Sequence, residues 1–326
     1  MPVYRSLAEA PQDFGPSAVT IGNFDGVHFG HRRILRRLKQ VSEEHGWRPA
    51  VLTFDPHPTR VVAPDRTPRL LTSPERRAEL IEEEGIHDVL ILPFTRELAR
   101  LSPEDFVRQL LVERLQVRAV LVGDNFRFGH QQAGNVELLK RLGRQFGFQT
   151  EVIPAVKCRG RIVSSSGIRE LIQSGRVALG GRFLRRPYAL EGDIISGRGV
   201  GSKQTVPTLN LATNAEVIPA RGVYITRTRD HDGGREWNSI TNVGYRPTFG
   251  ESEELSIETF LLDAPPDAPP RRIRLEFLER IRDERKFETP EALRRQILRD
   301  VGAARSYFRR FQAWVGRPEC SVGPAA

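Results

Sequence analysis

The sequence predicts a doubly wound α/β domain followed by a small six-stranded antiparallel β-barrel with a C-terminal helix. Three observations favour this fold class. The first half of the chain alternates short apolar runs with segments of helical periodicity, which is typical of a parallel sheet covered by helices. From residue 183 onward, short strand-like segments follow one another without intervening helices, as in small barrels. The length of 326 residues also exceeds what one core usually supports, so two domains are expected.

Five apolar runs are predicted as the strands of the first domain. They are short, rich in β-branched residues and continuous rather than alternating, as expected of strands that are buried on both faces. They span residues 18–21, 50–54, 89–92, 119–123 and 149–153. Because ligands bind at the carboxyl ends of such strands, the residues that follow each strand are candidates for a site.

Helical segments separate these strands. The segment over residues 32–41 carries its apolar side chains at helical spacing. The helix over 74–85 is preceded by Ser73, a typical N-cap residue, and has Pro74 at its first position. Further helices are predicted over residues 103–115, 135–146 and 167–173.

Six segments of the second half are predicted as the strands of the barrel. They are short, rich in β-branched and aromatic residues, and bounded by turn residues. They span residues 188–195, 209–212, 223–227, 239–243, 257–262 and 273–278. A long amphipathic helix then begins at Thr289-Pro290 and can cover the barrel. We therefore expect domains over residues 1–182 and 183–315, with a tail over 316–326.

Composition narrows the class of protein. Hydrophobic residues make up 39% of the chain and charged residues 28%, which is ordinary for a globular protein. No apolar run is long enough to span a membrane, and the N-terminus has no apolar signal segment. The two cysteines, Cys158 and Cys320, show no metal-binding spacing. We expect a cytoplasmic protein that uses neither disulfides nor a membrane.

The net charge of +9 raises the alternative of a nucleic-acid-binding protein. The arginines, however, are spread over the polar faces of predicted helices, with no aromatic residues interleaved among them. A basic surface that serves small anionic substrates is therefore favoured over a nucleic-acid partner. Such a protein is expected to be a monomer or a weak homo-oligomer.

Residues 22–31, Gly-Asn-Phe-Asp-Gly-Val-His-Phe-Gly-His, are the most informative stretch of the chain. They join the first predicted strand to the first predicted helix and place His28 and His31 around Gly30. Glycines let a phosphate approach the backbone, and the free N–H groups of a helix N-terminus attract anions. Two imidazoles added to such a turn suit a triphosphate. The alternative, that the histidines only cap or pack, is less favoured because other segments point to the same site.

Two further segments follow predicted strands. Residues 53–58, Thr-Phe-Asp-Pro-His-Pro, bring His57 to the same sheet edge, although they also read as a proline-framed turn. Residues 123–129, Gly-Asp-Asn-Phe-Arg-Phe-Gly, form a tight loop in which Asn125 can hydrogen-bond a ribose or a base. The two phenylalanines of this loop either stack on a ligand ring or pack in the core.

Residues 164–169, Ser-Ser-Ser-Gly-Ile-Arg, open the last predicted helix of the first domain. Hydroxyl groups and an arginine at a helix N-terminus suit a phosphate. Standing alone, the segment would be read as an ordinary serine N-cap followed by a surface arginine.

The second half carries weaker signals. Residues 197–203, Gly-Arg-Gly-Val-Gly-Ser-Lys, are a near miss to a phosphate-binding P-loop, and a glycine-rich lid between strands fits better. Thr208 and Asn210 offer oxygen ligands of the kind that Mg²⁺ prefers, or simply begin a strand. Glu258 is a lone acid in an apolar run, and strand alternation places it on the outer face.

The motifs GNFDGVHFGH, TFDPHP, GDNFRFG and SSSGIR, in this order and spacing, resemble the prokaryotic bifunctional riboflavin kinase/FAD synthetase family. The resemblance covers nearly the whole chain and implies a nucleotidyltransferase-like first domain that adenylylates FMN with ATP. It implies that His28 and His31 hold the ATP phosphates during catalysis. The other nucleotide-binding residues that it implies are Gly22, Asn23, Asp25, Gly30, His57, Asn125, Arg127, Ser165 and Arg169.

The resemblance extends to the second half, where it implies a riboflavin kinase. Glu258 would be the general base that takes the proton of the riboflavin 5′-hydroxyl group. Thr208 and Asn210 would bind ATP with Mg²⁺. The remaining nucleotide- or flavin-binding residues implied are Gly199, Gly201, Lys203 and Arg282. Ser202, Thr205 and Phe260 depart from the family's pattern, so an FMN adenylyltransferase with a weakened kinase half is the alternative.

Overall fold

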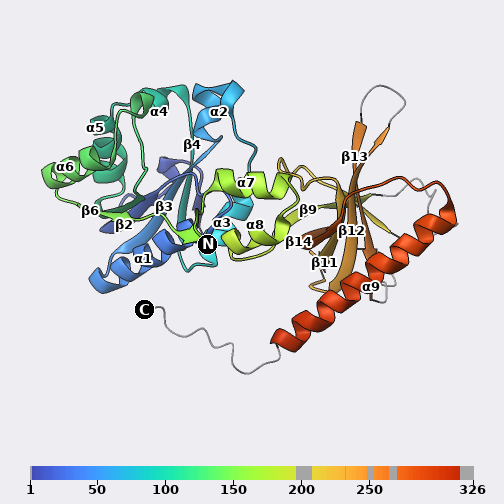
Figure 1. Ribbon diagram of the computed structural model, residues 1–326. Coiled ribbons are helices and arrows are strands. Elements are labelled where there is room, and N and C mark those ends of the chain that lie inside the picture. Colours follow the sequence, from blue (N-terminus) through green and yellow to red (C-terminus); the bar gives the residue numbers. More distant parts are fainter. Residues whose placement is uncertain (1, 196–207, 232, 248–252, 264–269, 316–326) are drawn as a thin grey trace. The chain divides into compact units, whose positions relative to one another are not determined.

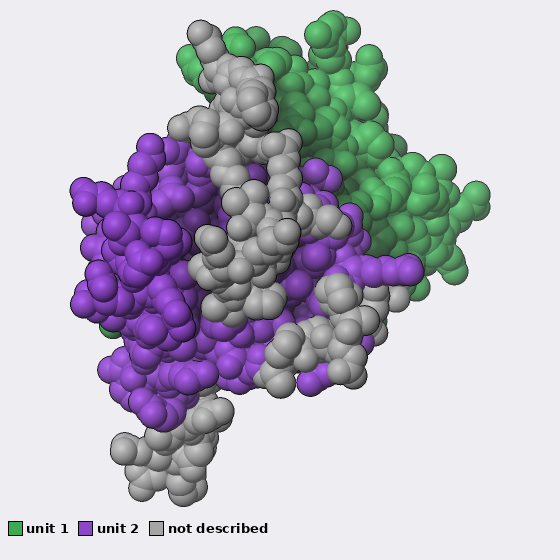
Figure 2. All heavy atoms as spheres, turned by 90° about the vertical axis from the view of Figure 1, so that its right-hand side faces the viewer, with its two compact units in different colours: residues 1–168, 183–185 green, residues 169–182, 186–326 purple. Residues whose placement is uncertain are grey.

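The computed structural model describes residues 2–195, 208–231, 233–247, 253–263 and 270–315 (Figure 1). The chain divides into two compact units, drawn in green and purple in Figure 2. Unit 1 comprises residues 1–168 and 183–185, and unit 2 comprises residues 169–182 and 186–326. Each unit has its own sheet and its own apolar core. The domain boundary expected after residue 182 stays a prediction.

Unit 1 is built on a six-stranded, fully parallel sheet, which confirms the predicted α/β class. The strands lie in the order β1-β4-β3-β2-β5-β6. Their bounds are Val3–Tyr4 for β1, Ser17–Ile21 for β2, Arg48–Asp55 for β3, Asp88–Pro93 for β4, Val117–Gly123 for β5 and Gln149–Ile153 for β6. From β2 the chain proceeds outward through β3 and β4, and then on the other side through β5 and β6. The direction reverses between β2 and β5, where ligands bind in sheets of this kind.

Helices cover both faces of this sheet (Figure 1). α1 (Phe29–His45) and α3 (Pro74–Glu82) bury their apolar side chains against one face. η3 (Phe106–Arg114) and α6 (Val136–Phe146) cover the other face. The continuous apolar strands of the sequence are explained by this arrangement, since every strand residue faces a helix on one side or the other.

Two predicted helices differ in detail. The helix expected over 103–115 begins as α5 (Pro103–Asp105) and continues as η3, which is π-helical. α3 ends at Glu82, and Gly85 then adopts a left-handed φ of 83° that turns the chain toward β4. α7 (Ser165–Gln173) confirms the last predicted helix and begins two residues earlier.

Several short elements were not predicted, because they are too short to show a hydrophobic period. They are β1 (Val3–Tyr4), η1 (Leu7–Glu9), α2 (Pro58–Val62), η2 (Pro64–Arg66), α4 (Arg96–Arg100), η4 (His130–Gln132), β7 (Lys157–Cys158) and β8 (Arg161–Ile162). The longer helix α8 (Val177–Leu184) was not predicted either, because Gly180 and Gly181 interrupt its helical pattern. Of these, α2 matters for the site because it follows His57 directly.

Unit 2 contains a closed antiparallel barrel of six strands, as predicted. The strands lie in the order β10-β13-β12-β11-β14-β9 around the barrel. Their bounds are Tyr188–Ile195 for β9, Leu209–Ala212 for β10, Gly222–Asp230 for β11, Glu236–Pro247 for β12, Glu253–Leu261 for β13 and Arg272–Arg282 for β14. α9 (Pro290–Val315) is the predicted C-terminal helix and packs on the barrel through Ala304 and Phe308.

The inner face of the barrel holds a chain of buried hydroxyl groups. Neighbouring hydroxyls are 2.8 or 2.9 Å apart and connect strands β11, β12 and β13. The chain runs in the order Thr228, Ser239, Thr226, Thr241 and Thr259. Each of these side chains is fully buried, so each hydroxyl depends on its neighbour for a partner.

Thr241→Val should destabilise the barrel by about 1–3 kcal/mol, because it leaves the buried hydroxyl of Thr259 without a partner. Thr259→Val is the matched control, since Thr241 keeps its bond to Thr226 and the loss should be smaller. Scanning calorimetry of the barrel transition measures both effects. Equal losses in the two variants would contradict the chain of hydrogen bonds as described.

Candidate active sites

The carboxyl ends of β2, β3 and β5 meet at one edge of the parallel sheet in unit 1. The loop that leaves β2 there is tightly wound. Phe24, Gly26 and Val27 have φ values of 47°, 78° and 36°, all in the left-handed region. A β-branched valine rarely adopts this conformation, and such strain is kept where the surroundings enforce it. The loop is therefore a fixed turn that delivers the chain to the N-terminus of α1.

His28 and His31 form a compact pair at the start of α1. His28 is the N-cap, and its Nδ1 accepts a hydrogen bond of 3.3 Å from the backbone N–H of His31. The two rings stack with centroids 3.7 Å apart and planes 15° apart. Because Nδ1 accepts, the neutral His28 ring carries its proton on Nε2. A Cβ at Gly30 would lie 3.1 Å from the His28 ring, so the glycine makes room for the stack.

Asn23 and His57 bring two different strand ends into contact. The side-chain amide of Asn23 lies 2.9 Å from Nε2 of His57. His57 is the N-cap of α2, and its Nδ1 accepts from the backbone N–H of Thr59 at 3.2 Å. The atom of Asn23 in this contact is the amide nitrogen Nδ2, and the donor and acceptor roles follow the tautomer of the His57 ring. The predicted meeting of these two motifs at the sheet edge is confirmed.

The carboxylate of Asp25 is buried and bound to the backbone. Its Oδ1 accepts from the N–H groups of Leu71 at 2.9 Å and of Thr72 at 3.2 Å. The side chain is 2% exposed, so these bonds hold the loop before α3 against the loop after β2. Ser165 of α7 donates its hydroxyl proton to the backbone carbonyl of Asp25 at 2.9 Å. The structure thus ties two of the four motifs together through Asp25.

Arg77 of α3 was not singled out by the sequence. It is 1% exposed, and its Nη1 donates to the hydroxyl of Thr53 at 2.9 Å and to the carbonyl of Phe54 at 3.1 Å. Burial lowers the pKa of the guanidinium, and the negative charges of Asp25 and Asp55 oppose that shift. A charged residue inside a predicted amphipathic helix reads as a surface residue, which is why no sequence signal marked it.

The loop after β5 presents polar side chains to solvent. Asn125 and Arg127 are both exposed. Phe126 and Phe128 stack on each other with centroids 5.4 Å apart, and Phe128 also contacts Phe106 in the core. Of the two alternatives for these phenylalanines, packing is the one that the structure shows. Arg169 lies on α7, four residues after Ser165, in the part of the helix that groups with unit 2.

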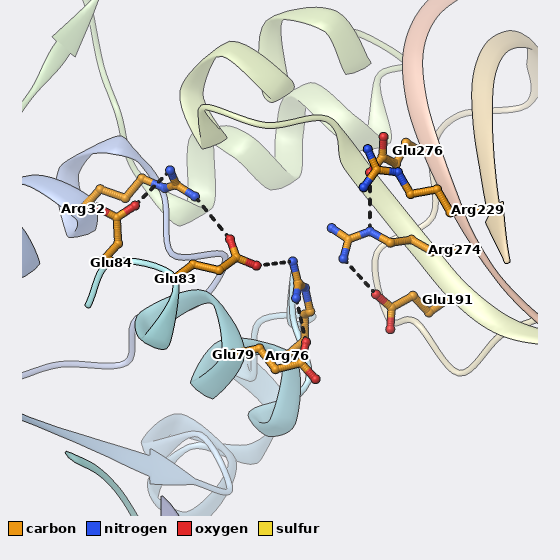
Figure 3. Close-up of polar contacts among 9 residues, drawn as sticks. All are labelled: Arg32, Arg76, Glu79, Glu83, Glu84, Glu191, Arg229, Arg274 and Glu276. Atoms are coloured by element: carbon orange, nitrogen blue, oxygen red, sulfur yellow. Dashed lines mark hydrogen bonds and ion pairs between the residues drawn. The ribbon is translucent and has the colours of Figure 1, made fainter. Parts of the chain in front are cut away.

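The arginine that follows the histidine pair is engaged by acidic residues (Figure 3). Arg32 of α1 lies 2.9 Å from Glu84, whose side chain is only 6% exposed, and 4.0 Å from Glu83. Arg76 of α3 pairs in turn with Glu83 at 3.1 Å and with Glu79 at 2.6 Å. These pairs join α1 to α3 and neutralise much of the positive charge beside the site.

A second cluster of charges lies on the barrel wall (Figure 3). Glu276 of β14 is 5% exposed and lies 3.4 Å from Arg229 and 3.6 Å from Arg274. Arg274 also lies 3.4 Å from Glu191 of β9. The cluster connects three neighbouring strands by charge pairing, so its arginines serve the barrel wall.

The strand register brings Asn210, Glu258 and Asn242 into one row across β10, β13 and β12. Residues directly opposite in antiparallel strands project on the same face with their Cβ atoms about 5 Å apart. This is the outer face, as alternation predicted for Glu258. The hydroxyl of Ser256 donates to the Glu258 carboxylate at 3.0 Å, and the Asn242 amide lies 3.5 Å from Glu284. No role was predicted from the sequence for Asn242, Ser256 or Glu284.

Arg282 continues the same row on β14, opposite Val223, whose other neighbour is Asn242. Its guanidinium binds the carboxylate of Asp300 on α9 through Nε at 3.1 Å and Nη2 at 2.8 Å. Asp300 is buried, and Gln296 donates to it at 2.7 Å. Arg282 therefore anchors the C-terminal helix to the edge of the row.

The glycine-rich segment of unit 2 falls outside the described residues, together with Gly199, Gly201 and Lys203. Thr208 precedes β10 and is exposed, and Asn210 is half-buried. No group of three or more His, Cys, Asp or Glu side chains with metal-binding geometry occurs within the described ranges. A cation in this unit would therefore rely on a few protein oxygens and on the phosphates of its substrate, as Mg²⁺ commonly does.

The fold and these two sites define a two-domain enzyme, in which a nucleotide-binding α/β domain precedes a kinase barrel. The family model for FAD synthetase matches residues 10–167, and the model for riboflavin kinase matches residues 184–308. The chain belongs to the bifunctional riboflavin kinase/FMN adenylyltransferase family and carries both domains.

The relatives are similar along almost their whole length. A bifunctional riboflavin kinase/FMN adenylyltransferase from Pseudomonas fluorescens is 34% identical, over 94% of this chain and 97% of the relative. The protein of that name from Escherichia coli strain K12 is 33% identical, over 93% and 96%. The one from Haemophilus influenzae is 32% identical, over 94% and 99%.

A crystal structure of a protein named as a macrolide-efflux protein, from Streptococcus pneumoniae, has the same fold. Its TM-score is 0.83 with 24% identity, over 93% of this chain and 98% of that chain. At this identity the likeness shows the fold alone. Within the part of the chain that the structure describes, no helix is long and apolar enough to cross a membrane.

Gly30→Ala should slow the conversion of FMN to FAD, because the new Cβ would lie 3.1 Å from the His28 ring and shift it. A small displacement of a group that positions a substrate costs on the order of tenfold or more in kcat. Stability should not fall, since alanine favours a helix over glycine. Gly302→Ala on α9, where a Cβ meets nothing within 4 Å, is the control and should leave the rate unchanged. Equal rates for both variants would remove the steric argument.

Proposed function

We propose that FMN is adenylylated at the carboxyl edge of the parallel sheet, and that riboflavin is phosphorylated on the outer row of the barrel. The observation that carries the first assignment is the stacked pair of His28 and His31 at the N-terminus of α1, at the point where the strand order reverses. Incubation with riboflavin, ATP and Mg²⁺, followed by chromatography of the flavins, tests both assignments at once. FMN must appear first, and FAD must follow.

In the adenylylation step, a phosphate oxygen of FMN attacks the α-phosphorus of ATP. The bond from the α-phosphorus to its bridging oxygen breaks, and pyrophosphate leaves. Such chemistry needs positioning and charge neutralisation more than a covalent nucleophile. His28 and His31 are assigned to the ATP phosphates, with the helix dipole behind them.

The other nucleotide contacts that we propose surround this pair. Gly22 and Gly30 allow close approach to the backbone, and Asn23 with His57 forms a polar wall at the adjoining strand end. Asn125 and Arg127, which are exposed in the loop after β5, are assigned to the ribose or base. Asp25 is assigned a supporting role in the site, because its carboxylate holds the loop at Leu71 and Thr72 in place. Ser165 and Arg169 are assigned to the phosphates.

In the kinase step, Glu258 accepts the proton of the riboflavin 5′-hydroxyl group as that oxygen attacks the γ-phosphorus of ATP, and ADP leaves. The Ser256 hydroxyl orients the carboxylate, and Asn210 and Asn242 flank it on both neighbouring strands. Arg282 is assigned to the flavin side of the row. Gly199, Gly201 and Lys203 are assigned to the ATP phosphates from the sequence.

Mg²⁺ fits the donors at the start of β10. The Thr208 hydroxyl and the Asn210 side-chain carbonyl are hard oxygen ligands, and Asn210 lies directly across from Glu258. When bound, the ion would neutralise charge on the ATP phosphates. The alternative of an adenylyltransferase with a weakened kinase half is not favoured, because the riboflavin kinase model matches the second half.

We further infer that the protein works in the cytoplasm on small molecules, without a nucleic-acid partner, as a monomer or weak homo-oligomer. Pairing of Arg32, Arg76 and Arg274 with glutamates supports the absence of a nucleic-acid partner, since those positive charges are already paired within the protein. Absence of salt-sensitive binding to duplex or single-stranded DNA is the expected result. The tail over 316–326 is assigned no role.

His31→Ala should lower FAD formation from supplied FMN by about a hundredfold or more, since one preorganised phosphate contact is lost. FMN formation from riboflavin should stay near the parental rate, because the barrel performs it. Both rates come from the same preparation by chromatography. A variant that makes FAD at the parental rate would reduce His31 to a structural partner of His28.

Glu258→Gln should lower riboflavin phosphorylation by roughly 10²–10⁴-fold, because the amide cannot accept the hydroxyl proton. Adenylylation of supplied FMN should be unchanged. The melting temperature should barely move, since the side chain lies on the outer face and keeps its size. Near-parental kinase activity would exclude Glu258 as the base, and loss of both activities with a lower melting temperature would indicate a structural role.

A further inference from the structure

Arg77 has the largest side chain among the fully buried residues that the structure describes, and none of the motifs contains it. It lies in the first turn of α3, beneath the two strand ends that carry Asn23 and His57. We propose that Arg77 is a positioning residue for adenylylation, which sets the distance between Asn23 and His57 by holding both segments that carry them. This inference rests on the adenylylation function proposed for unit 1.

Both side-chain hydrogen bonds of Arg77 come from a single nitrogen. Nη1 donates to the Thr53 hydroxyl at 2.9 Å and to the Phe54 carbonyl at 3.1 Å. These acceptors lie near the end of β3, which stops at Asp55, two residues before His57. The guanidinium therefore fixes where that segment leaves the sheet.

The Thr53 hydroxyl transmits the contact to the neighbouring strand. It has one proton, which it donates to the backbone carbonyl of Asn23 at 3.2 Å, so it must accept from Arg77. Donation therefore runs from Arg77 to Thr53 and from Thr53 to Asn23, and it cannot run in the opposite direction. A buried chain of this kind holds the ends of β2 and β3 in one geometry, and the Asn23–His57 contact forms across that gap.

Stability alone does not account for an arginine at this place. Its Nε is buried and has no hydrogen-bond partner among the described residues, which is costly for a charged group. The neighbours of Arg77 on α3, Ala78, Leu80 and Ile81, are apolar and pack in the core. An apolar residue would satisfy the core equally well. The charge is instead directed at the strand ends and balanced by the carboxylates of Asp25 and Asp55.

The test compares Arg77→Met, Arg77→Lys and Thr53→Val in the full chain, with FMN and ATP supplied. Arg77→Met should lower kcat roughly tenfold to a hundredfold with little change in KM, because reacting groups are misplaced rather than lost. Arg77→Lys should recover much of this rate, since one nitrogen can serve both acceptors. Thr53→Val should also lower kcat. In the double variant, Arg77→Met should lower kcat less than it does in the parental protein, because Thr53→Val has already removed the same chain of hydrogen bonds.

Leu142→Ala in α6, on the other face of the sheet, is the matched control. It should lower the melting temperature without lowering kcat per folded molecule, which separates destabilisation from positioning. Parental kcat in Thr53→Val, no recovery in Arg77→Lys, or full additivity in the double variant would each overturn the proposal. If Arg77→Met does not fold, the other two variants still decide. A parental enzyme that makes no FAD from FMN would instead overturn the proposed function of unit 1.

Discussion

The parallel alignment of β2, β3 and β5 is the constraint on which the proposed nucleotide site depends. It makes three loops, separated by dozens of residues in sequence, start from one edge of the sheet. The N-terminus of α1 then supplies donors and a positive dipole end at that edge. Without this alignment, the histidine pair at the start of α1 would have no second wall. Asn23 and His57 form that wall only because their strands run side by side in the same direction.

Much of this could be predicted from the sequence because it is local. Each of these features depends on neighbours only a few residues away in the sequence. They are the apolar runs, the N-caps at Ser73 and Asn135, and the histidines around Gly30. Arg77 could not be predicted, since its partners lie on a strand more than twenty residues away. Its burial depends on how α3 packs against the sheet, which the sequence does not show. Arginine is also usually exposed, so a surface position was the expectation.

Some residues of the motifs are held by other groups of the protein. Asp25 stands inside the first motif, yet its carboxylate is occupied by the backbone at Leu71 and Thr72. Arg282 likewise binds Asp300 on α9. A family pattern keeps supporting residues beside contacting ones, and the sequence has no signal that separates the two. Distances do separate them, because a saturated carboxylate or guanidinium has fewer atoms left for a substrate.

The hydroxyl chain inside the barrel has a consequence for the acid on its outside. Thr241 pairs with Thr259 on the inner face, and the next residues, Asn242 and Glu258, pair on the outer face. A slip of one residue between β12 and β13 would exchange the two faces and bury the acid. The hydrogen bonds between the hydroxyl groups therefore fix the register of these strands. If the outer row binds the alcohol substrate as proposed, substitutions there that are meant to accept other alcohols should leave the inner threonines unchanged, because these hold the register of β12 and β13.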